Sequence, residues 1–444
     1  MVSAEPNVSA SSIESDFQVS ERYRLYVAWL LGIVYLFNQV DRQIFAILQQ
    51  PIKEAFQFSD GQLGLIGGTA FGLFYATLAV PIGRLADRRN RVKIITLSLT
   101  LWSLFTALTG WSRNFLQMLG ARMIVGIGEA GCSPSAFSIL SDYFESKRRA
   151  TAIAIYSLGA SGGSIVGLLV GSKVAEVYGW RTAFFAMGLP GILLAIVVRL
   201  TLREPPRGLS DRKTTTSSPP AVLPVLKKLL AKRSFVYLTL AAACYSIAAN
   251  GIGAFYSVFL IRSHHLSLSM AGRWLAIASL GGLAGTFLCG KLADVLSNRS
   301  RDVRWLLWTP AFVLLINLPF GLLLYTTTDK NTAFTLLVVS ISLGSAYLAP
   351  TIATTQRLVG AHERALSSAI LFFVMSFVGL TLGPWLAGHL SDTVKDHFLT
   401  QGVPAAQASA DGLRFAFMCL LVAPVLAAAF YFLSARTVRE EIVE

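Results

Sequence analysis

The most regular feature of the sequence is the alternation of long apolar runs with short polar segments. Each run is long enough for an α-helix that crosses the ~30 Å hydrocarbon core of a bilayer. The strands of a membrane β-barrel would be only about 10 residues long and would alternate in polarity. The pattern therefore predicts an all-α membrane protein with twelve transmembrane helices. The runs lie at about 24–48, 61–83, 92–111, 114–140, 150–178, 182–199, 235–261, 270–296, 304–326, 331–355, 365–390 and 412–435.

The composition supports this interpretation and excludes several classes of protein. Of the 444 residues, 54% are hydrophobic and only 14% are charged, whereas soluble domains average ~25% charged residues. A disordered chain, a coiled coil and an ordinary soluble enzyme are therefore excluded. The net charge of +14 is compatible with nucleic-acid binding. Because polytopic membrane proteins also concentrate Lys and Arg in their cytoplasmic loops, we expect no nucleic-acid partner.

One polar segment is much longer than the others and divides the chain. It contains consecutive prolines, a Ser/Thr-rich run and several lysines, a composition that does not bury its backbone. We expect a linker that carries short amphipathic pieces. The predicted organisation is a tail at 1–20, a six-helix bundle at 21–200, a linker at 201–233, a second six-helix bundle at 234–436 and a tail at 437–444. The first 20 residues are polar, so we expect no cleaved signal peptide.

Basic residues near the ends of the predicted helices predict the orientation. They cluster after the second helix, after the fourth helix and in the linker, and are sparse after the first and third helices. By the positive-inside rule both termini and the linker face the cytoplasm. The basic residues after the second and fourth helices are Arg84, Arg88, Arg89, Arg91, Lys93, Lys147, Arg148 and Arg149.

The two six-helix sets repeat one another. The motif Gly83-Arg-Leu-Ala-Asp87 returns as Gly290-Lys-Leu-Ala-Asp294, and Arg149-Ala150 returns as Arg364-Ala365, at similar offsets. Similar motifs at corresponding places indicate a duplicated bundle with pseudo-symmetric halves.

These motifs carry a resemblance to a known family. The segment from Gly83 to Lys93 is similar to the loop between helices two and three of the major facilitator superfamily, although Asn90 replaces a usual Gly. The run from Arg122 to Ala130 is similar to the superfamily's fourth-helix motif. The resemblance implies the major facilitator fold. It also implies an inner gate with a helix-facing acid and an arginine that reaches Asp142 or Glu145.

A narrower resemblance points to the Spinster branch of this superfamily. It rests on Asn38-Gln-Val-Asp41-Arg42 and on the run from Val125 to Pro134. The branch is associated with transport of lysolipids and sphingosine phosphate, in some members coupled to protons. The resemblance implies a multi-pass transporter in the inner (plasma) membrane of a cell. We expect a monomer that contacts membrane lipids and binds an amphipathic substrate.

Two short motifs are similar to nucleotide-binding sequences but lie in the wrong context. Gly126-x-Gly128-x-x-Gly131 matches a dinucleotide fingerprint, yet it lies inside a membrane-length helix. Gly285-x-x-x-x-Gly290-Lys291 lacks the Ser or Thr of a P-loop and follows an apolar helix. The cysteines and histidines form no metal motif. We therefore expect no enzyme activity, no metal and no cofactor, with a proton gradient as the energy source.

Four ionisable residues lie inside predicted membrane helices, where an unpaired charge costs several kcal/mol. They are Asp41, Arg42, Arg122 and Glu129. Asn38 shares a face of helix one with Asp41 and Arg42, because the three are separated by three and four residues. Arg122 and Glu129 are seven residues apart and share a face of helix four. The alternative interpretation is a structural ion pair that fixes helices one and four together.

The chemistry of these residues suggests roles. Burial raises the pKa of a carboxylate and a neighbouring guanidinium lowers it, so Asp41 and Glu129 are our candidates for proton coupling. Arg42 and Arg122 suit a phosphate or carboxylate headgroup, with Asn38 and Glu129 beside them. We hypothesise that protonation of Asp41 frees an arginine for the substrate, with Glu129 as a second switch.

The remaining candidates are a facing wall and a gate. The wall candidates on helices seven and ten are Tyr245, Asn250, Tyr256, Thr351, Thr354, Thr355, Gln356 and Arg357. The gate candidates near the cytoplasmic helix ends are Gly83, Asp87, Arg88, Arg91, Asp142, Arg148 and Asp294.

Three functions are compatible with these features. The favoured one is proton-coupled transport of an amphipathic anion such as a lysophospholipid or sphingosine phosphate. The second is proton-coupled transport of a small organic anion or drug, which predicts a compact polar pocket. The third is a membrane sensor on the same fold, which predicts binding without flux.

Overall fold

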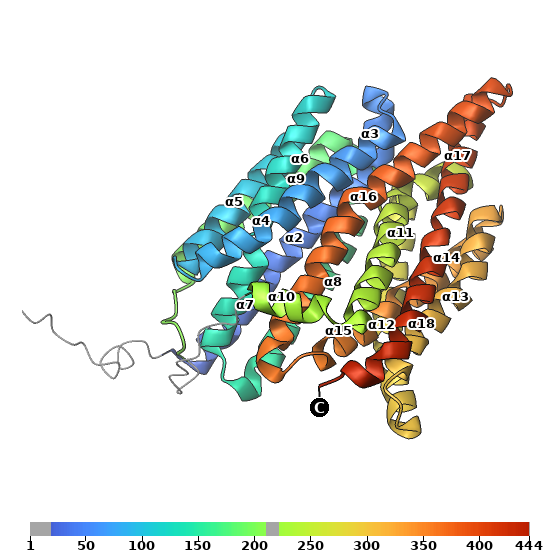
Figure 1. Cartoon of the computed structure of the whole chain (residues 1–444). Helices are drawn as coiled ribbons and strands as arrows, with labels where there is room; N and C mark the ends of the chain where they lie inside the picture. Colours follow the sequence, from blue (N-terminus) through green and yellow to red (C-terminus); the bar gives the residue numbers. More distant parts are fainter. Residues whose placement is uncertain (1–18, 210–221, 444) are drawn as a thin grey trace, which may run out of the picture.

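The structure is a computed structural model that describes residues 19–209 and 222–443. Its described residues are helices joined by short connections, with no strand among them. The N-terminal half (the N-half) and the C-terminal half (the C-half) lie side by side, with α16 at their junction (Figure 1). The helices of the N-half are α2 (Glu21–Phe56), α3 (Asp60–Gly64), η1 (Leu65–Ala70), α4 (Phe71–Ala86), α5 (Arg91–Thr109), α6 (Phe115–Glu129), α7 (Cys132–Tyr143), α8 (Ser146–Tyr178) and α9 (Trp180–Thr201).

The C-half repeats this arrangement after the short helix α10 (Val222–Leu230). Its helices are α11 (Arg233–His264), α12 (Leu268–Ser300), α13 (Trp305–Thr326), α14 (Lys330–Gly344), η2 (Ser345–Tyr347), α15 (Leu348–Arg357), η3 (Ala361–Glu363), α16 (Arg364–Thr400), α17 (Ala405–Leu420) and α18 (Val422–Glu441).

These elements form the predicted membrane helices. Within the described residues, eleven helical segments are long and apolar enough to cross a bilayer. Four of them are interrupted spans, namely α3–η1–α4, α6–α7, α14–η2–α15 and α17–α18. The remaining predicted span, the first in the chain, is α2. It is a 36-residue helix, and its polar run from Asn38 to Gln43 lowers its hydropathy. The predicted all-α fold with two six-helix halves is confirmed.

The linker and the C-terminal segment are partly helical. Residues 210–221 of the predicted linker lie outside the described residues, as does most of the predicted N-terminal tail. Helix α10 is amphipathic, with Val225 and Leu229 buried, and its Lys228 forms an ion pair of 2.5 Å with Glu363. Helix α18 continues to Glu441, within the segment predicted as a tail. There the Glu441 carboxylate accepts a hydrogen bond of 2.9 Å from the backbone N–H of Ser234.

A stripe of glycines explains how closely α8 packs on α2. Gly159, Gly163, Gly167 and Gly171 recur every fourth residue on one face of α8. A methyl group at Gly159 or Gly163 would overlap backbone atoms of α2. Small residues permit such close helix contact in membranes. The regular spacing of these glycines is thus explained by the packing of α8 on α2.

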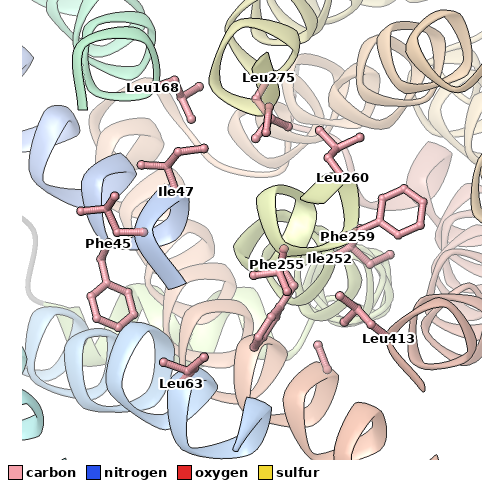
Figure 2. Close-up of a cluster of buried hydrophobic side chains, with 14 of the residues drawn as sticks. Phe45, Ile47, Leu63, Leu168, Ile252, Phe255, Phe259, Leu260, Leu275 and Leu413 are labelled. Carbon is pink, nitrogen blue, oxygen red and sulfur yellow. The ribbon is translucent and has the colours of Figure 1, made fainter. Parts of the chain in front are cut away.

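Apolar side chains from both halves share one core. The cluster in Figure 2 includes Phe45 and Ile47 of α2, Leu168 of α8, Phe255 of α11 and Leu275 of α12. All of these are less than 10% exposed. The two halves are therefore in van der Waals contact through this cluster.

Replacing Gly163 with Ala tests the α2–α8 contact. The added methyl group would meet the carbonyl oxygen of Leu36 and the side chain of Gln39, and overpacking of this kind costs about 1–3 kcal/mol. We expect a lower midpoint of thermal unfolding in detergent. Gly162→Ala is the matched control, because its methyl group would meet only Leu36 Cδ1 at 3.5 Å. Equal melting of the two variants would contradict this account.

Candidate functional site

The four intramembrane charges form two crossed ion pairs between α2 and α6. Arg122 Nη1 donates to Asp41 Oδ2 at 3.1 Å, and Arg42 Nε donates to Glu129 Oε2 at 2.8 Å. Asp41 and Arg42, which are adjacent on α2, thus each pair with a residue of opposite charge on α6. We call Asp41, Arg42, Arg122 and Glu129 the charge cluster.

Burial differs between the two arginines. The Arg122 side chain is 2% exposed and Asp41 4%, whereas Arg42 is 25% exposed beside a fully buried Glu129. Both arginines therefore satisfy a buried carboxylate, but only Arg42 is partly open to the surroundings. The structure thus separates two arginines that the sequence left equivalent as headgroup ligands.

Aromatic rings complete the surroundings of the arginines. The Arg42 guanidinium lies 4.4 Å from the centroid of the Tyr75 ring and 5.0 Å from that of Phe71. The Arg122 guanidinium lies 5.0 Å from the Phe45 ring centroid. Aromatic faces attract cations and exclude water. They therefore hold the guanidinium groups without adding further negative charge.

The pairing leaves two buried polar atoms without a hydrogen-bond partner in the described part of the chain. They are Nε of Arg122 and Oε1 of Glu129. Asn38 is also buried, with 2% exposure, on the same helix as Asp41. A carboxylate with one free oxygen retains an atom that can accept a proton.

A cavity of about 500 Å³ lies mainly in the C-half, and its lining residues include none of the charge cluster. Helix α2 contributes Gln43, Ala46 and Ile47 to its wall, immediately after Arg42 in the sequence. None of its lining residues is charged, and most are apolar. Its polar residues from the C-half are Tyr245, Tyr256, Ser257, Ser279, Thr286, Asn317, Tyr325, Ser340, Ser345 and Tyr347. We call this space the C-half cavity.

The structure divides the predicted facing wall. Tyr245 and Tyr256 line the C-half cavity, whereas three other candidates have local partners instead. The Asn250 amide donates to the Ser246 carbonyl at 2.8 Å, and the Thr354 hydroxyl donates to the Pro350 carbonyl at 2.9 Å.

The third, Gln356, lies on α15 and donates from Nε2 to Ser368 Oγ on α16 at 3.1 Å. Of the eight predicted wall residues, only the two tyrosines line the C-half cavity, and Thr351, Thr355 and Arg357 are also absent from its lining. Asn250, Thr354 and Gln356 bond to backbone or to neighbouring helices, which is how most polar side chains in helix bundles are satisfied.

The predicted gate residues fall into two groups, one that forms ion pairs within the N-half and its adjoining linker and one that is exposed, with no ion pair between the halves in the described part of the chain. Arg91 forms ion pairs with Asp142 and with Glu204, the latter at 2.7 Å, all within the N-half and its adjoining linker. Arg148 pairs with Glu21 at 2.6 Å, where both side chains are exposed.

The second group consists of Asp87, Arg88 and Asp294, which are exposed. Gly83 faces Pro134 of α7 at an ordinary contact distance. Because the exposed acids do not hold the halves together in this structure, their gating role stays a prediction.

The opposite end of the bundle is closed by a network that the sequence analysis did not identify. Asp60 is fully buried at the start of α3, where Arg262 of α11 donates two hydrogen bonds of 2.8 Å to its carboxylate. Lys53 Nζ and Ser391 Oγ also donate to it, at 2.5 and 2.8 Å. We call these residues, with Asp392, the Asp60 lock.

Asp392 completes the lock through a helix N-terminus. Its carboxylate accepts hydrogen bonds from the backbone N–H groups of Asp60 and Gly61, at 3.0 and 2.7 Å. A helix N-terminus attracts anions through its free N–H groups. Since Lys53 and Asp60 belong to the N-half and the other members to the C-half, the lock joins the halves at this end.

The other bonds between the halves extend only part-way along the bundle. Thr69 donates to the Thr381 carbonyl at 2.6 Å, and Ser257 donates to the Ala46 carbonyl at 2.6 Å. Further along α4, Val80 and Leu85 are almost half exposed. The halves are thus joined at the Asp60 end, and α4 is more exposed toward the Asp87 end.

The sequence held a weak signal for the lock. Ser59-x-x-Gln62 is a capping box that marks Asp60 as a first-turn acid. Charges at predicted helix ends are usually solvated, so pattern alone does not reveal that Asp60, Arg262 and Asp392 meet.

Comparisons with known proteins agree with this architecture. The profile of the Major Facilitator Superfamily matches residues 31–384. The chain belongs to that superfamily. This transporter is 32% identical to an MFS-type efflux pump of Mycolicibacterium smegmatis, over 98% of this chain and 99% of the pump.

Two further relatives support the Spinster resemblance. A crystal structure of a bacterial homolog to the human lysosomal transporter Spinster, in an inward-facing and unoccupied conformation, matches with a TM-score of 0.90. It is 32% identical and covers 96% of this chain and 100% of that chain. Protein spinster homolog 1 of Mus musculus is 30% identical over 55% of this chain and 47% of the mouse protein. The resemblance predicted from the sequence is confirmed.

Replacing Asp60 with Asn tests the lock. The change removes the anion of Arg262 and Lys53, and loss of one partner of a buried ion pair costs about 3–5 kcal/mol. We expect the Asp60 end of the transporter to open. Electron–electron distances between spin labels at the exposed positions Gln57 and Gln401 should lengthen. Asp396→Asn, an exposed acid on α16, is the control and should leave the distances unchanged.

Proposed function

We propose that this transporter moves an amphipathic anion in exchange for, or together with, protons, by alternating access between its two halves. The observation that carries the proposal is the separation of charge. The charge cluster lies between α2 and α6 of the N-half, and the C-half cavity, which α2 also borders, is lined by uncharged residues. A cargo with a charged head and an apolar tail complements both regions.

The exposed arginine is our candidate for headgroup binding. Arg42 is the only member of the cluster with a side chain more than 5% exposed in this structure. A guanidinium binds phosphate or carboxylate through two parallel hydrogen bonds. Arg42 precedes Gln43, which lines the cavity, so a headgroup on Arg42 would leave its tail beside Ala46 and Ile47. Lysophospholipids and sphingosine phosphate have this form.

Charge balance supports coupling to protons. The cluster holds two guanidinium groups and two carboxylates, so its buried charges are balanced. Protonation of Asp41 would leave one cation without an anion, which is costly in a low dielectric. Arg122 would then turn to Glu129, which already interacts with it, and release Arg42 to the substrate anion. Glu129, with its free oxygen, is the second proton acceptor.

Alternating access follows from the same geometry. In this structure the Asp60 lock joins the halves at one end, while the predicted gate acids Asp87 and Asp294 are exposed at the other. Opening the lock while the Asp87 end closes would present the cluster to the opposite side. The expected orientation places the Asp87 end in the cytoplasm.

The decisive experiment on the cargo is flux in proteoliposomes. We expect a fluorescent lysophosphatidic acid to be transported, and a sugar phosphate of the same headgroup not to be, because only the lipid fills the apolar cavity. Arg42→Lys keeps the positive charge but loses the planar fork, and should raise the KM for the lysolipid about tenfold. Preferential flux of the sugar phosphate would support the small-anion alternative, and binding of either compound without flux would support a sensor.

The proton-coupling role predicts a specific pH dependence. With lysolipid as substrate, transport by the unmodified protein should respond to a pH gradient, and Asp41→Asn should transport at a rate that no longer depends on pH. The amide keeps the size of the side chain but does not titrate. Asp396→Asn should retain the pH dependence of the unmodified protein. A pH profile of Asp41→Asn identical to that of the unmodified protein would exclude the role.

A further inference from the structure

A third helix reaches the charge cluster through one hydroxyl group. Thr106, near the end of α5, is 1% exposed, and its Oγ1 is hydrogen-bonded to Asp41 Oδ1. The same oxygen lies 2.8 Å from the backbone carbonyl oxygen of Trp102, one turn earlier. Asp41 is thus held from two directions, by Arg122 of α6 on one oxygen and by Thr106 of α5 on the other.

A threonine hydroxyl has one hydrogen and two acceptor lone pairs. It therefore donates to Asp41 or to Trp102, but not fully to both. When Asp41 is ionised, Thr106 donates to the carboxylate. When Asp41 carries a proton, the carboxylic acid donates to Thr106 Oγ1, and Thr106 donates to the Trp102 carbonyl. Rotation of one hydroxyl hydrogen therefore keeps the hydrogen bond between Asp41 and Thr106 in both states.

We propose that Thr106 is a positioning residue that keeps Asp41 hydrogen-bonded in both protonation states and sets the pH at which Asp41 takes up its proton. The inference rests on the proposed proton-coupling role of Asp41. Hydrogen bonds to an ionised group are about twice as strong as those between neutral groups. Thr106 therefore favours the ionised form, and its loss should move proton uptake to higher pH.

Other threonines on α5 show that Thr106 is distinct. Thr96, Thr100 and Thr109 also donate to the carbonyl four residues earlier, at 2.8 to 2.9 Å. Such bonds are common in helices and by themselves mark no site. Among these four threonines in the described residues, only Thr106 is also hydrogen-bonded to a carboxylate.

The ionisable groups around Asp41 are few. In the described part of the chain they include Arg42 on its own helix, Arg122 and Glu129 from α6, and Tyr75 from α4 next to Arg42. Tyr35 of α2 and Cys132 of α7 also interact with Arg42 and Glu129. Helices α7, α8, α9 and α11 also pack on α2. Their acids, lysines and arginines lie near the helix ends, away from the middle of α2. Thr106 is therefore a neutral polar group whose hydroxyl can adjust to either protonation state of Asp41.

The test is a carboxyl titration followed by infrared difference spectroscopy on the full chain in liposomes, which needs no substrate. The signal of Asp41 is the part that Asp41→Asn removes. In Thr106→Val, a near-isosteric change without a hydroxyl, we expect its midpoint to rise by about one pH unit, the equivalent of ~1.4 kcal/mol. Thr106→Ser restores the hydroxyl and should restore the midpoint. Thr100→Val, the matched control on the same helix, should not shift it.

The outcomes separate this inference from the proposed function. Absence of any Asp41 signal in the unmodified protein would overturn proton coupling. A normal Asp41 signal with the same midpoint in Thr106→Val and Thr100→Val would overturn the role of Thr106 alone. Thermal melting identifies folded variants, and Thr106→Ala replaces Thr106→Val if the latter does not fold. A pH profile of lysolipid transport that shifts with the infrared midpoint would connect the residue to flux.

Discussion

The structure depends on the requirement that charges buried within a membrane bundle be paired. Two arginines and two carboxylates lie between α2 and α6, and each buried acid has a guanidinium partner. Removing one charge leaves another unbalanced in a region of low dielectric, where the penalty is several kcal/mol. Any change in protonation therefore requires a compensating change in pairing. Such a requirement converts a structural ion-pair cluster into a candidate switch.

Helix α2 connects this switch to the rest of the molecule. It carries Asp41 and Arg42, and one turn later its Ala46 and Ile47 line the C-half cavity. Its other face packs against the glycine stripe of α8, which leaves little space for independent movement. Near its end, Lys53 belongs to the Asp60 lock. A rearrangement of the cluster is therefore positioned to act on the cavity and on the closed end through one continuous helix.

The two halves share an architecture but differ in chemistry. Gly83–Asp87 and Gly290–Asp294 occupy matching places, and both acids are exposed in this structure. The cluster belongs to the N-half alone, whereas the tyrosines and the apolar cavity wall belong mainly to the C-half. Duplication explains the common fold. The difference between the halves places charged residues on one side and mainly uncharged residues on the other, an arrangement that suits the amphipathic cargo we propose.

The sequence by itself determined the class of fold, the helices, the repeat and the four charges, because hydropathy and helical spacing are local properties of the chain. Only the tertiary structure decided that Arg42 pairs with Glu129 and Arg122 with Asp41, that Arg42 is the exposed arginine, and that Asn250, Thr354 and Gln356 lie outside the cavity wall. The hydrogen bond of Thr106 to Asp41 and the meeting of the Asp60 lock residues were likewise decided by the tertiary structure. Pairing and exposure depend on which helices meet and at what height, and residues far apart in the chain do not encode that relation in any local pattern.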